Sequence, residues 1–223
     1  MPDELDLQPV FPLPNVVLFP RAVLPLHIFE PRYRSMIADV LDGGQSLVIA
    51  LLKPGWEADY YGNPDVHSLG CVGRVIRHQK LPDGRYNVVL QGETKVLVDR
   101  YERRQPYRIA RVHNVDEDRS WSAEANAASM AAQLVELYRR AHQRQGTALD
   151  LEHLLSAPAS PEELVNTIAM NLDAEPAVRQ QLLECDRLDL RYRAVEQILR
   201  DSSRTQDFID RVRHLRPADP RRN

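Results

Sequence analysis

The clearest β-sheet signal in the chain is the stretch VGRVIRHQKLPDGRYNVVL, residues 72–90. Within it, Pro82 fixes the backbone φ and Gly84 supplies a positive φ, which is typical of a tight turn. We therefore predict a β-hairpin with strands at 72–78 and 86–90. The second strand places its apolar residues on one face, as expected for a strand packed on a core: Tyr86, Val88 and Leu90.

Other short apolar runs lie around this hairpin in the first half of the chain. They cover residues 16–19, 23–24, 46–52, 94–98 and 107–112, with Gly92 breaking the run after the hairpin. Prolines near the first two runs lack the N–H that a central strand donates, so we expect those strands at sheet edges or bulges. Several short strands with many turns predict a small closed or nearly closed β-barrel.

One helix is predicted among these strands, between Pro31 and Asp42. Its apolar residues form a single stripe, and Gly43-Gly44 ends it. The stripe consists of Met36, Ile37, Val40 and Leu41. A long loop at 53–67 follows the next strand and carries Trp56, Tyr60 and Tyr61.

The chain changes character near residue 118, after which Ala, Leu, Glu, Arg and Gln recur at helical spacing. This spacing predicts helices at about 122–142, from Pro161, from about Pro176, and from Asp186 through Val212. Ser160 can cap the second of them. The expected buried stripes of the first and last helices are Ala131, Leu134, Val135, Tyr138 and Leu188, Tyr192, Val195, Leu199. The tail after about residue 217 has the composition of a disordered segment.

The net charge of −3 is spread evenly along the chain. Residues 1–118 hold 14 basic and 16 acidic side chains, and residues 119–223 hold 15 and 16, which sum to the totals of 29 and 32. Neither half therefore presents a field that attracts nucleic acid or an anionic membrane.

Features of targeting and redox chemistry point to the cytoplasm. The acidic N-terminus lacks the basic and apolar regions of a secretory signal, and no apolar run approaches the ~18 residues that span a bilayer. Cys71 and Cys185 are far apart in the chain, so we expect reduced thiols, the first inside the barrel and the second in the helical core.

Two stretches, taken together, resemble the amino-terminal substrate-binding domain of Lon proteases, the LON domain. The first is FPLPNVVLFP at 11–20 with LPLHIFEPRY at 24–33; the second is GCVG at 70–73 with KLPDGR at 80–85 and then Gly92. A PDG turn occurs in many β proteins, but this order and spacing is far more specific. The predicted helices also fit, so the resemblance covers about residues 7–215.

The resemblance implies an α+β fold in two parts. Residues 1–118 would form a PUA-like small β-barrel with one inserted helix, and residues 119–223 an all-α bundle with a long C-terminal helix. It also implies recognition of unfolded or damaged polypeptide, which Lon passes to a fused motor and peptidase. The loop 54–61 looks more like stand-alone members of the family than like the protease itself. We therefore predict a cytoplasmic, stand-alone binding protein, a monomer or weak dimer, which works alone or with a separate protease or chaperone.

The chain departs from the family pattern at Lys95, where the family usually carries arginine after Gly92. Lysine keeps the charge but loses the planar five-donor guanidinium. The sequence therefore leaves open whether this side chain makes a fixed contact with a carbonyl group.

The sequence contains no motif that is typical of catalysis, cofactor binding or metal binding. There is no GxxxxGK[ST] phosphate loop, and none of Lys53, Lys80 and Lys95 lies in a motif that activates a serine. No two of the seven histidines have the three-to-five-residue spacing of a metal site. We expect no enzyme activity, no catalytic residues, no cofactor and no metal.

A domain that binds unfolded polypeptide needs exposed apolar surface and, for strand addition, a free sheet edge. The candidates for that surface are Phe29, Tyr33, Trp56, Tyr60 and Tyr61. The alternative for Phe29 and Tyr33 is that they seal the helix onto the barrel, since aromatic side chains bury large areas in cores. The alternative for the other three is that the loop folds back as a lid over one barrel end.

The rival interpretation is a PUA-like RNA-binding module. RNA binding needs clustered basic residues for the phosphates, and the only concentration is Arg100, Arg103, Arg104, Arg108 and Arg111. The neutral charge of the first half argues against it. An unrecognised hydrolase site would need a nucleophile and base that the sequence does not show.

Overall fold

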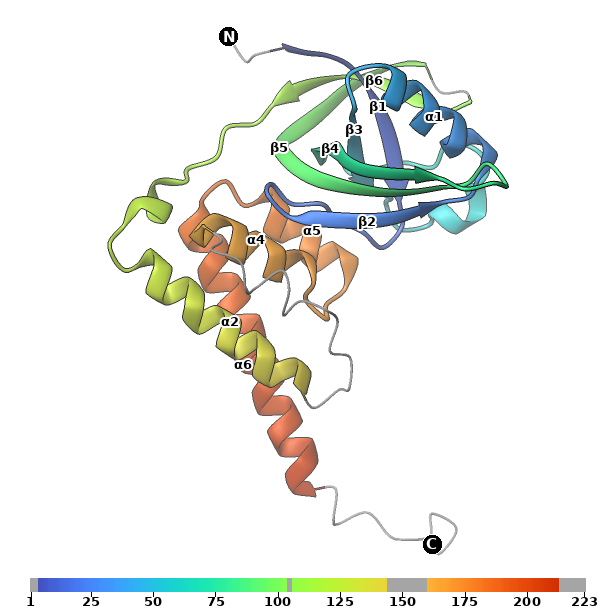
Figure 1. Ribbon diagram of the computed structural model, residues 1–223. Coiled ribbons are helices and arrows are strands. Elements are labelled where there is room, and N and C mark those ends of the chain that lie inside the picture. Colours follow the sequence, from blue (N-terminus) through green and yellow to red (C-terminus); the bar gives the residue numbers. More distant parts are fainter. Residues whose placement is uncertain (1–3, 104–105, 144–159, 213–223) are drawn as a thin grey trace, which may run out of the picture.

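The computed structural model describes residues 4–103, 106–143 and 160–212 (Figure 1). It has a mixed α+β architecture in which the helical second half lies against one end of the β structure. The strands are β1 (Glu4–Leu13), β2 (Val23–Ile28), β3 (Ser46–Leu51), β4 (Leu69–Lys80), β5 (Tyr86–Arg103) and β6 (Arg108–Asn114). They form one six-stranded sheet in the order β2-β5-β4-β3-β1-β6.

The predicted hairpin is confirmed as β4 and β5. Gly84 has a φ of 80°, and its N–H donates to the Leu81 carbonyl at 2.9 Å, which closes the turn. Tyr86, Val88 and Leu90 are all buried, as their alternation predicted. The strands are longer than predicted because β4 pairs with β5 from Leu69↔Leu97 to Lys80↔Tyr86.

The predicted break at Gly92 is wrong: β5 continues through it to Arg103. Next to the glycine, the pairing of β5 with β4 changes register: Val72 pairs with Thr94, whereas Gly73 pairs with Gly92. A Cβ at Gly92 would lie 2.0 Å from the Phe19 carbonyl oxygen, so the glycine is needed for a close approach of two backbone segments.

The predicted closed barrel is not confirmed. The first part of β5 pairs with β2 and β4, and its last part, Val96–Arg103, pairs with β6. Register shifts in β5 against β6, between Val98 and Arg100 and between Tyr101 and Arg103, accompany this change of partner. Bulges of this kind bend a strand. The architecture is therefore a six-stranded sheet with an additional β5–β6 pairing.

The proline-rich segment at 11–25 behaves differently from the prediction. β1 pairs with both β3 and β6 and still contains Pro9 and Pro12, so it is not an edge strand. Residues 16–19 form no strand but pack inward, with Val17, Leu18 and Phe19 at most 3% exposed. β2, which contains Pro25, does lie at the end of the sheet order, as expected for a strand with a missing donor.

The predicted helix between the strands is α1 (Pro31–Asp42), with the predicted bounds. Tyr33, Met36, Ile37 and Val40 are buried, and Leu41 packs partly buried against the same core. Proline at the first position suits a helix start because the missing N–H would have no intrahelical partner there.

The second half contains α2 (Ala127–Gln143), α4 (Pro161–Met170), α5 (Pro176–Glu184) and α6 (Leu188–Val212). The first predicted helix starts later than expected, because the short 3-10 helix η2 (Ser120–Ala123) takes its first residues. A second 3-10 helix, η1 (Trp56–Asp59), lies in the long loop between β3 and β4. The cap of α4 is confirmed, with Ser160 Oγ accepting from the Glu163 N–H at 3.2 Å. The predicted stripes of α2 and α6 are buried. The tail after residue 217 lies outside the described residues.

The sheet and the helices share hydrophobic core. One cluster joins Val17, Phe19, Ala22 and Leu51 of the first half to buried residues of η2, α2, α4, α5 and α6. Two further clusters lie within the β part, one of them under α1. Burial of apolar surface between the halves holds them together, at roughly 25 cal/mol for each Å².

Candidate functional site

The predicted aromatic loop forms a small exposed cluster. The Trp56 and Tyr60 rings lie 5.5 Å apart between centroids, and the Tyr60 and Tyr61 rings lie 5.1 Å apart in an edge-on arrangement. Tyr61 is 88% exposed, and Trp56 and Tyr60 are partly buried. We call these three residues the aromatic loop. Tyr61 presents a large apolar ring that contributes little to the core.

Polar contacts hold the aromatic loop against the start of α1. The Tyr60 hydroxyl donates to the Glu30 carboxylate, and this hydrogen bond is the main reason that the pKa of Tyr60 rises to about 12. Arg32 donates to Glu30 at 3.1 Å and to the Tyr60 carbonyl at 3.2 Å, and its guanidinium lies 5.5 Å from the Tyr60 ring centre. These contacts fix the position of the loop relative to α1.

The other two predicted contact residues have different environments. Phe29 is 59% exposed at the junction of β2 and α1, so it does not seal the helix onto the sheet. Tyr33 is only 7% exposed and packs on Phe11 with ring centroids 4.4 Å apart. Burial, more than the charges around it, raises the pKa of Tyr33. Tyr33 therefore has the core role that was its alternative interpretation.

A pocket of about 200 Å³ lies beside the aromatic loop, between the sheet and α5. Trp56 forms part of its wall and thereby belongs to both features. The remaining lining residues come from the ends of strands, from loops and from the first turn of α5: Pro14, Asn15, Leu51, Leu52, Pro54, His67, Glu175, Pro176 and Ala177. The sequence did not predict this pocket, because its two walls lie more than a hundred residues apart.

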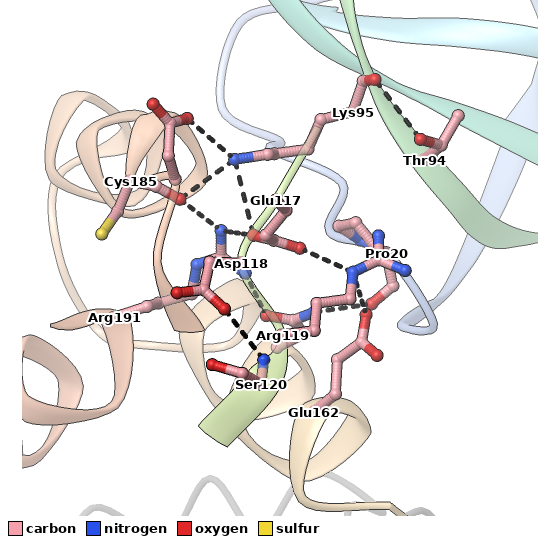
Figure 2. A network of polar contacts seen from close by, with 12 residues as sticks. Pro20, Thr94, Lys95, Glu117, Asp118, Arg119, Ser120, Glu162, Cys185 and Arg191 are labelled. Carbon is pink, nitrogen blue, oxygen red and sulfur yellow. Dashed lines mark hydrogen bonds and ion pairs between the residues drawn. The ribbon is translucent and has the colours of Figure 1, made fainter. Parts of the chain in front are cut away.

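A buried polar network joins the two halves of the chain (Figure 2). The side chains of Lys95, Glu117 and Arg191 are each 0% exposed. Glu117 lies between the two cations, 3.4 Å from Lys95 Nζ and in direct contact with Arg191 Nη2. Lys95 comes from β5, Glu117 from the segment after β6, and Arg191 from α6.

Arg191 satisfies nearly all of its donors inside this network. It donates to the carbonyls of Leu182 and Cys185, both at 2.8 Å, and to Asn166 Oδ1 at 2.7 Å. Asn166 in turn donates to the Pro20 carbonyl at 3.0 Å. Arg119 extends the network outward, from Glu117 Oε2 at 3.2 Å to Glu162 at 3.4 Å. A buried charge costs several kcal/mol unless it is paired and hydrogen-bonded, and here every charge has partners.

The comparison with known families decides the identity of the chain. The family described as the ATP-dependent protease La (LON) substrate-binding domain matches residues 8–201. The chain belongs to this family. Relatives include Lon protease 2 of Syntrophobacter fumaroxidans, 31% identical over 82% of this chain, and Lon protease of Anaeromyxobacter dehalogenans, 29% identical over 86%. This LON domain corresponds to 22% of the length of either relative.

Solved LON domains have the same fold. The N-terminal domain of Mycobacterium avium complex Lon protease matches 88% of this chain and 99% of its own, with a TM-score of 0.64 and 18% identity. A Lon N-terminal domain protein from Xanthomonas campestris matches 87% of this chain and 98% of its own, with a TM-score of 0.56 and 22% identity.

Lys95, where the family resemblance led us to expect arginine, makes a carbonyl contact. Its Nζ donates to the Cys185 carbonyl at 3.0 Å and lies 3.4 Å from Asp186 Oδ1. Cys185 is partly buried in the turn between α5 and α6, which corrects its predicted place in the helical core. Cys71 is buried as predicted, and that burial raises its pKa far above the ordinary value.

The described part of this LON domain shows neither a metal site nor a membrane-spanning helix. Among residues 4–103, 106–143 and 160–212, no group of three or more His, Cys, Asp and Glu side chains is placed to hold a metal ion. Over the same residues, no helix is both long and apolar enough to cross a membrane. Two of the clustered arginines have other roles: Arg100 pairs with Glu102 at 2.7 Å, and buried Arg108 donates to the Pro64 carbonyl at 2.7 Å.

Proposed function

We propose that this LON domain binds unfolded or damaged polypeptide and neither cleaves it nor hydrolyses ATP. Membership in the substrate-binding family supports the role, and the sequence contains no phosphate loop. The observation that carries the proposal is the exposure of Tyr61 beside Tyr60, whose ring also contacts Trp56, on a loop that polar contacts hold against α1. Exposed aromatic rings on a fixed support are typical contacts for promiscuous binding.

The proposed contact surface consists of Phe29, Trp56, Tyr60 and Tyr61. Phe29 is included because it is exposed and directly precedes Glu30, which accepts the Tyr60 hydrogen bond; its own ring stacks on His27 at 6.4 Å between centroids. The edge strand β2 ends at Ile28, directly before Phe29, but Pro25 removes one of its donors. Side chains are therefore the main contacts, with strand addition as a lesser contribution.

Further features of the proposal come from the family resemblance. We propose two structural units, residues 1–118 with a PUA-like barrel topology and residues 119–223 with the helices. The protein would act in the cytoplasm as a monomer or weak dimer, alone or beside a separate protease or chaperone. The β5–β6 pairing favours the barrel topology, because it joins β6, at one end of the sheet order, to β5, the second strand from the other end.

Binding is tested by fluorescence anisotropy with labelled, reduced and carboxymethylated lactalbumin, a protein that cannot refold. We expect saturable binding with a Kd of about 10 µM or weaker, without ATP. Tyr61→Ala and Trp56→Ala should each weaken it about five- to thirtyfold, because exposed aromatic contacts are worth roughly 1–2 kcal/mol. Tyr61→Phe keeps the ring and should bind normally.

Leu190→Ala is the matched control, since Leu190 is an exposed apolar residue on α6 rather than on the aromatic loop. It should leave the affinity unchanged. The absence of saturable binding up to high micromolar concentrations would refute the proposed function. A salt-dependent shift of RNA in a gel at physiological ionic strength would favour the RNA-binding alternative instead.

A further inference from the structure

We infer that the pocket between the sheet and α5 receives one apolar side chain of the bound polypeptide, and that acids around it select basic neighbours of that side chain. This inference rests on the proposed function and adds the class of segment that is recognised. We call the site the α5 pocket. It would act as the anchor point, while the aromatic loop contacts the chain on one side of it.

The walls of the α5 pocket favour an apolar occupant. Leu51, Leu52 and Trp56 form the sheet side, and Pro176 and Ala177 form the helix side. A volume of about 200 Å³ is enough for one large side chain but too small for a whole peptide segment. Burial of one Leu or Phe side chain would supply most of the binding free energy that a single pocket of this size can contribute.

The α5 pocket is continuous with the aromatic loop through Trp56. That residue lines the pocket and also contacts Tyr60, whose ring in turn contacts Tyr61. An extended polypeptide with one side chain in the pocket would therefore pass over the exposed Tyr61 ring. A central pocket surrounded by weaker contacts is the usual arrangement of binding hot spots.

The surroundings of the α5 pocket are acidic. Glu57 and Asp65 lie within two residues of the lining residues Trp56 and His67 in the sequence, and like Glu175 they are exposed and form no ion pair within 4 Å among the described residues. Glu175 lines the pocket at the start of α5, where the helix dipole stabilises a carboxylate. The basic groups near the pocket are Lys53, Arg179, which donates to the Asn15 carbonyl, and His67, which lies 3.7 Å from the Glu184 carboxylate. The excess of acidic over basic side chains around the pocket complements a lysine or arginine next to the apolar side chain of the bound polypeptide.

The two walls are fixed to each other, so the pocket exists before a ligand arrives. Arg179 of α5 donates to the Asn15 carbonyl at 2.9 Å and to the Leu172 carbonyl at 3.0 Å. Gln180 donates to the Leu69 carbonyl at 3.0 Å. A preformed pocket binds without the cost of ordering its own walls.

The decisive variant fills the pocket. Ala177 is exposed on α5, so Ala177→Trp can place an indole in the pocket without disturbing the core. We expect this variant to weaken lactalbumin binding at least about tenfold, as loss of a hot spot does. Ala132→Trp is the matched control, because Ala132 is an equally exposed alanine on α2 outside the pocket. It should bind normally, and circular dichroism should show both variants folded.

The charge preference is tested with labelled peptides that hold one Phe flanked by Lys, one Phe flanked by Glu, or one Ala flanked by Lys. Amide chemical-shift titration should show Leu52 and Ala177 moving with the first peptide and far less with the others. Glu175→Lys should reverse the preference between the Lys and Glu peptides.

The outcomes separate the inference from the proposed function. If the full chain binds lactalbumin and Ala177→Trp binds equally well, the pocket is not the anchor, although polypeptide recognition stands. Equal shifts with the Lys-flanked and Glu-flanked peptides would overturn the charge preference. If neither lactalbumin nor any peptide binds the unmodified chain, the proposed function itself fails.

Discussion

Glu117→Gln is expected to lower the free energy of unfolding by about 3–5 kcal/mol, the usual effect of removing one partner from a buried ion pair. The carboxylate lies between Lys95 and Arg191, whose side chains are both 0% exposed. A neutral amide would leave their positive charges without the compensating charge at the centre of the network. Urea denaturation followed by circular dichroism measures the loss.

Glu93→Gln provides the control, because Glu93 lies on β5 two residues from Lys95 but outside the buried network. Glu93 pairs with Arg74 at the surface, where the carboxylate is 36% exposed and solvent screens the charges. This variant should change the free energy of unfolding by less than about 1 kcal/mol. A similar small loss for Glu117→Gln would show that the network does not join the two halves energetically.

Gly92→Ala is the second large expected effect. An added Cβ would lie 2.0 Å from the Phe19 carbonyl oxygen and 2.8 Å from its carbonyl carbon, so backbone rather than a flexible side chain must move. Two hydrogen bonds resist that movement, from Arg21 N–H to the Gly92 carbonyl at 2.8 Å and from Gly92 N–H to the Ala22 carbonyl at 2.9 Å. We expect a loss of about 3 kcal/mol, at the upper end of overpacking effects.

Gly44→Ala is the comparison for that experiment, since the nearest atom to its added Cβ is 3.9 Å away. Its effect on the free energy of unfolding should be within about 0.5 kcal/mol, as for an ordinary surface change. Equal stability of Gly92→Ala and Gly44→Ala would mean that the segment at 19–22 can shift away from β5 at little cost.

Both large effects involve the same short segment. Phe19 lies against Gly92 of β5, and its ring lies 5.5 Å from the guanidinium of Arg191 in the network. The Pro20 carbonyl accepts from Asn166 of α4. Residues 19–22 thus connect the sheet to the helices, whereas the sequence pattern had suggested only that Phe19 ends a strand begun at residue 16.

Local patterns were sufficient for much of the fold. The turn at Gly84, the α1 stripe and the Ser160 cap each depend on neighbouring residues in the sequence, and each was predicted correctly. The proximity of Trp56, Tyr60 and Tyr61 could also be predicted, because they lie close together in the chain, but the sequence did not indicate that only Tyr61 would be largely exposed. The exposure of Phe29 and the burial of Tyr33 could not be predicted, since two aromatic residues four positions apart give the same signal.

What the sequence determined by itself was therefore the identity of the elements: hairpin, inserted helix, helical second half, and the LON-family signature that orders them. Only the tertiary structure decided the partners of β5 and β6, the buried contacts of Lys95, and the α5 pocket. The physical reason is separation along the chain. Periodicity and turn chemistry act over a few residues, whereas Lys95, Glu117 and Arg191 meet only after the two halves have packed together.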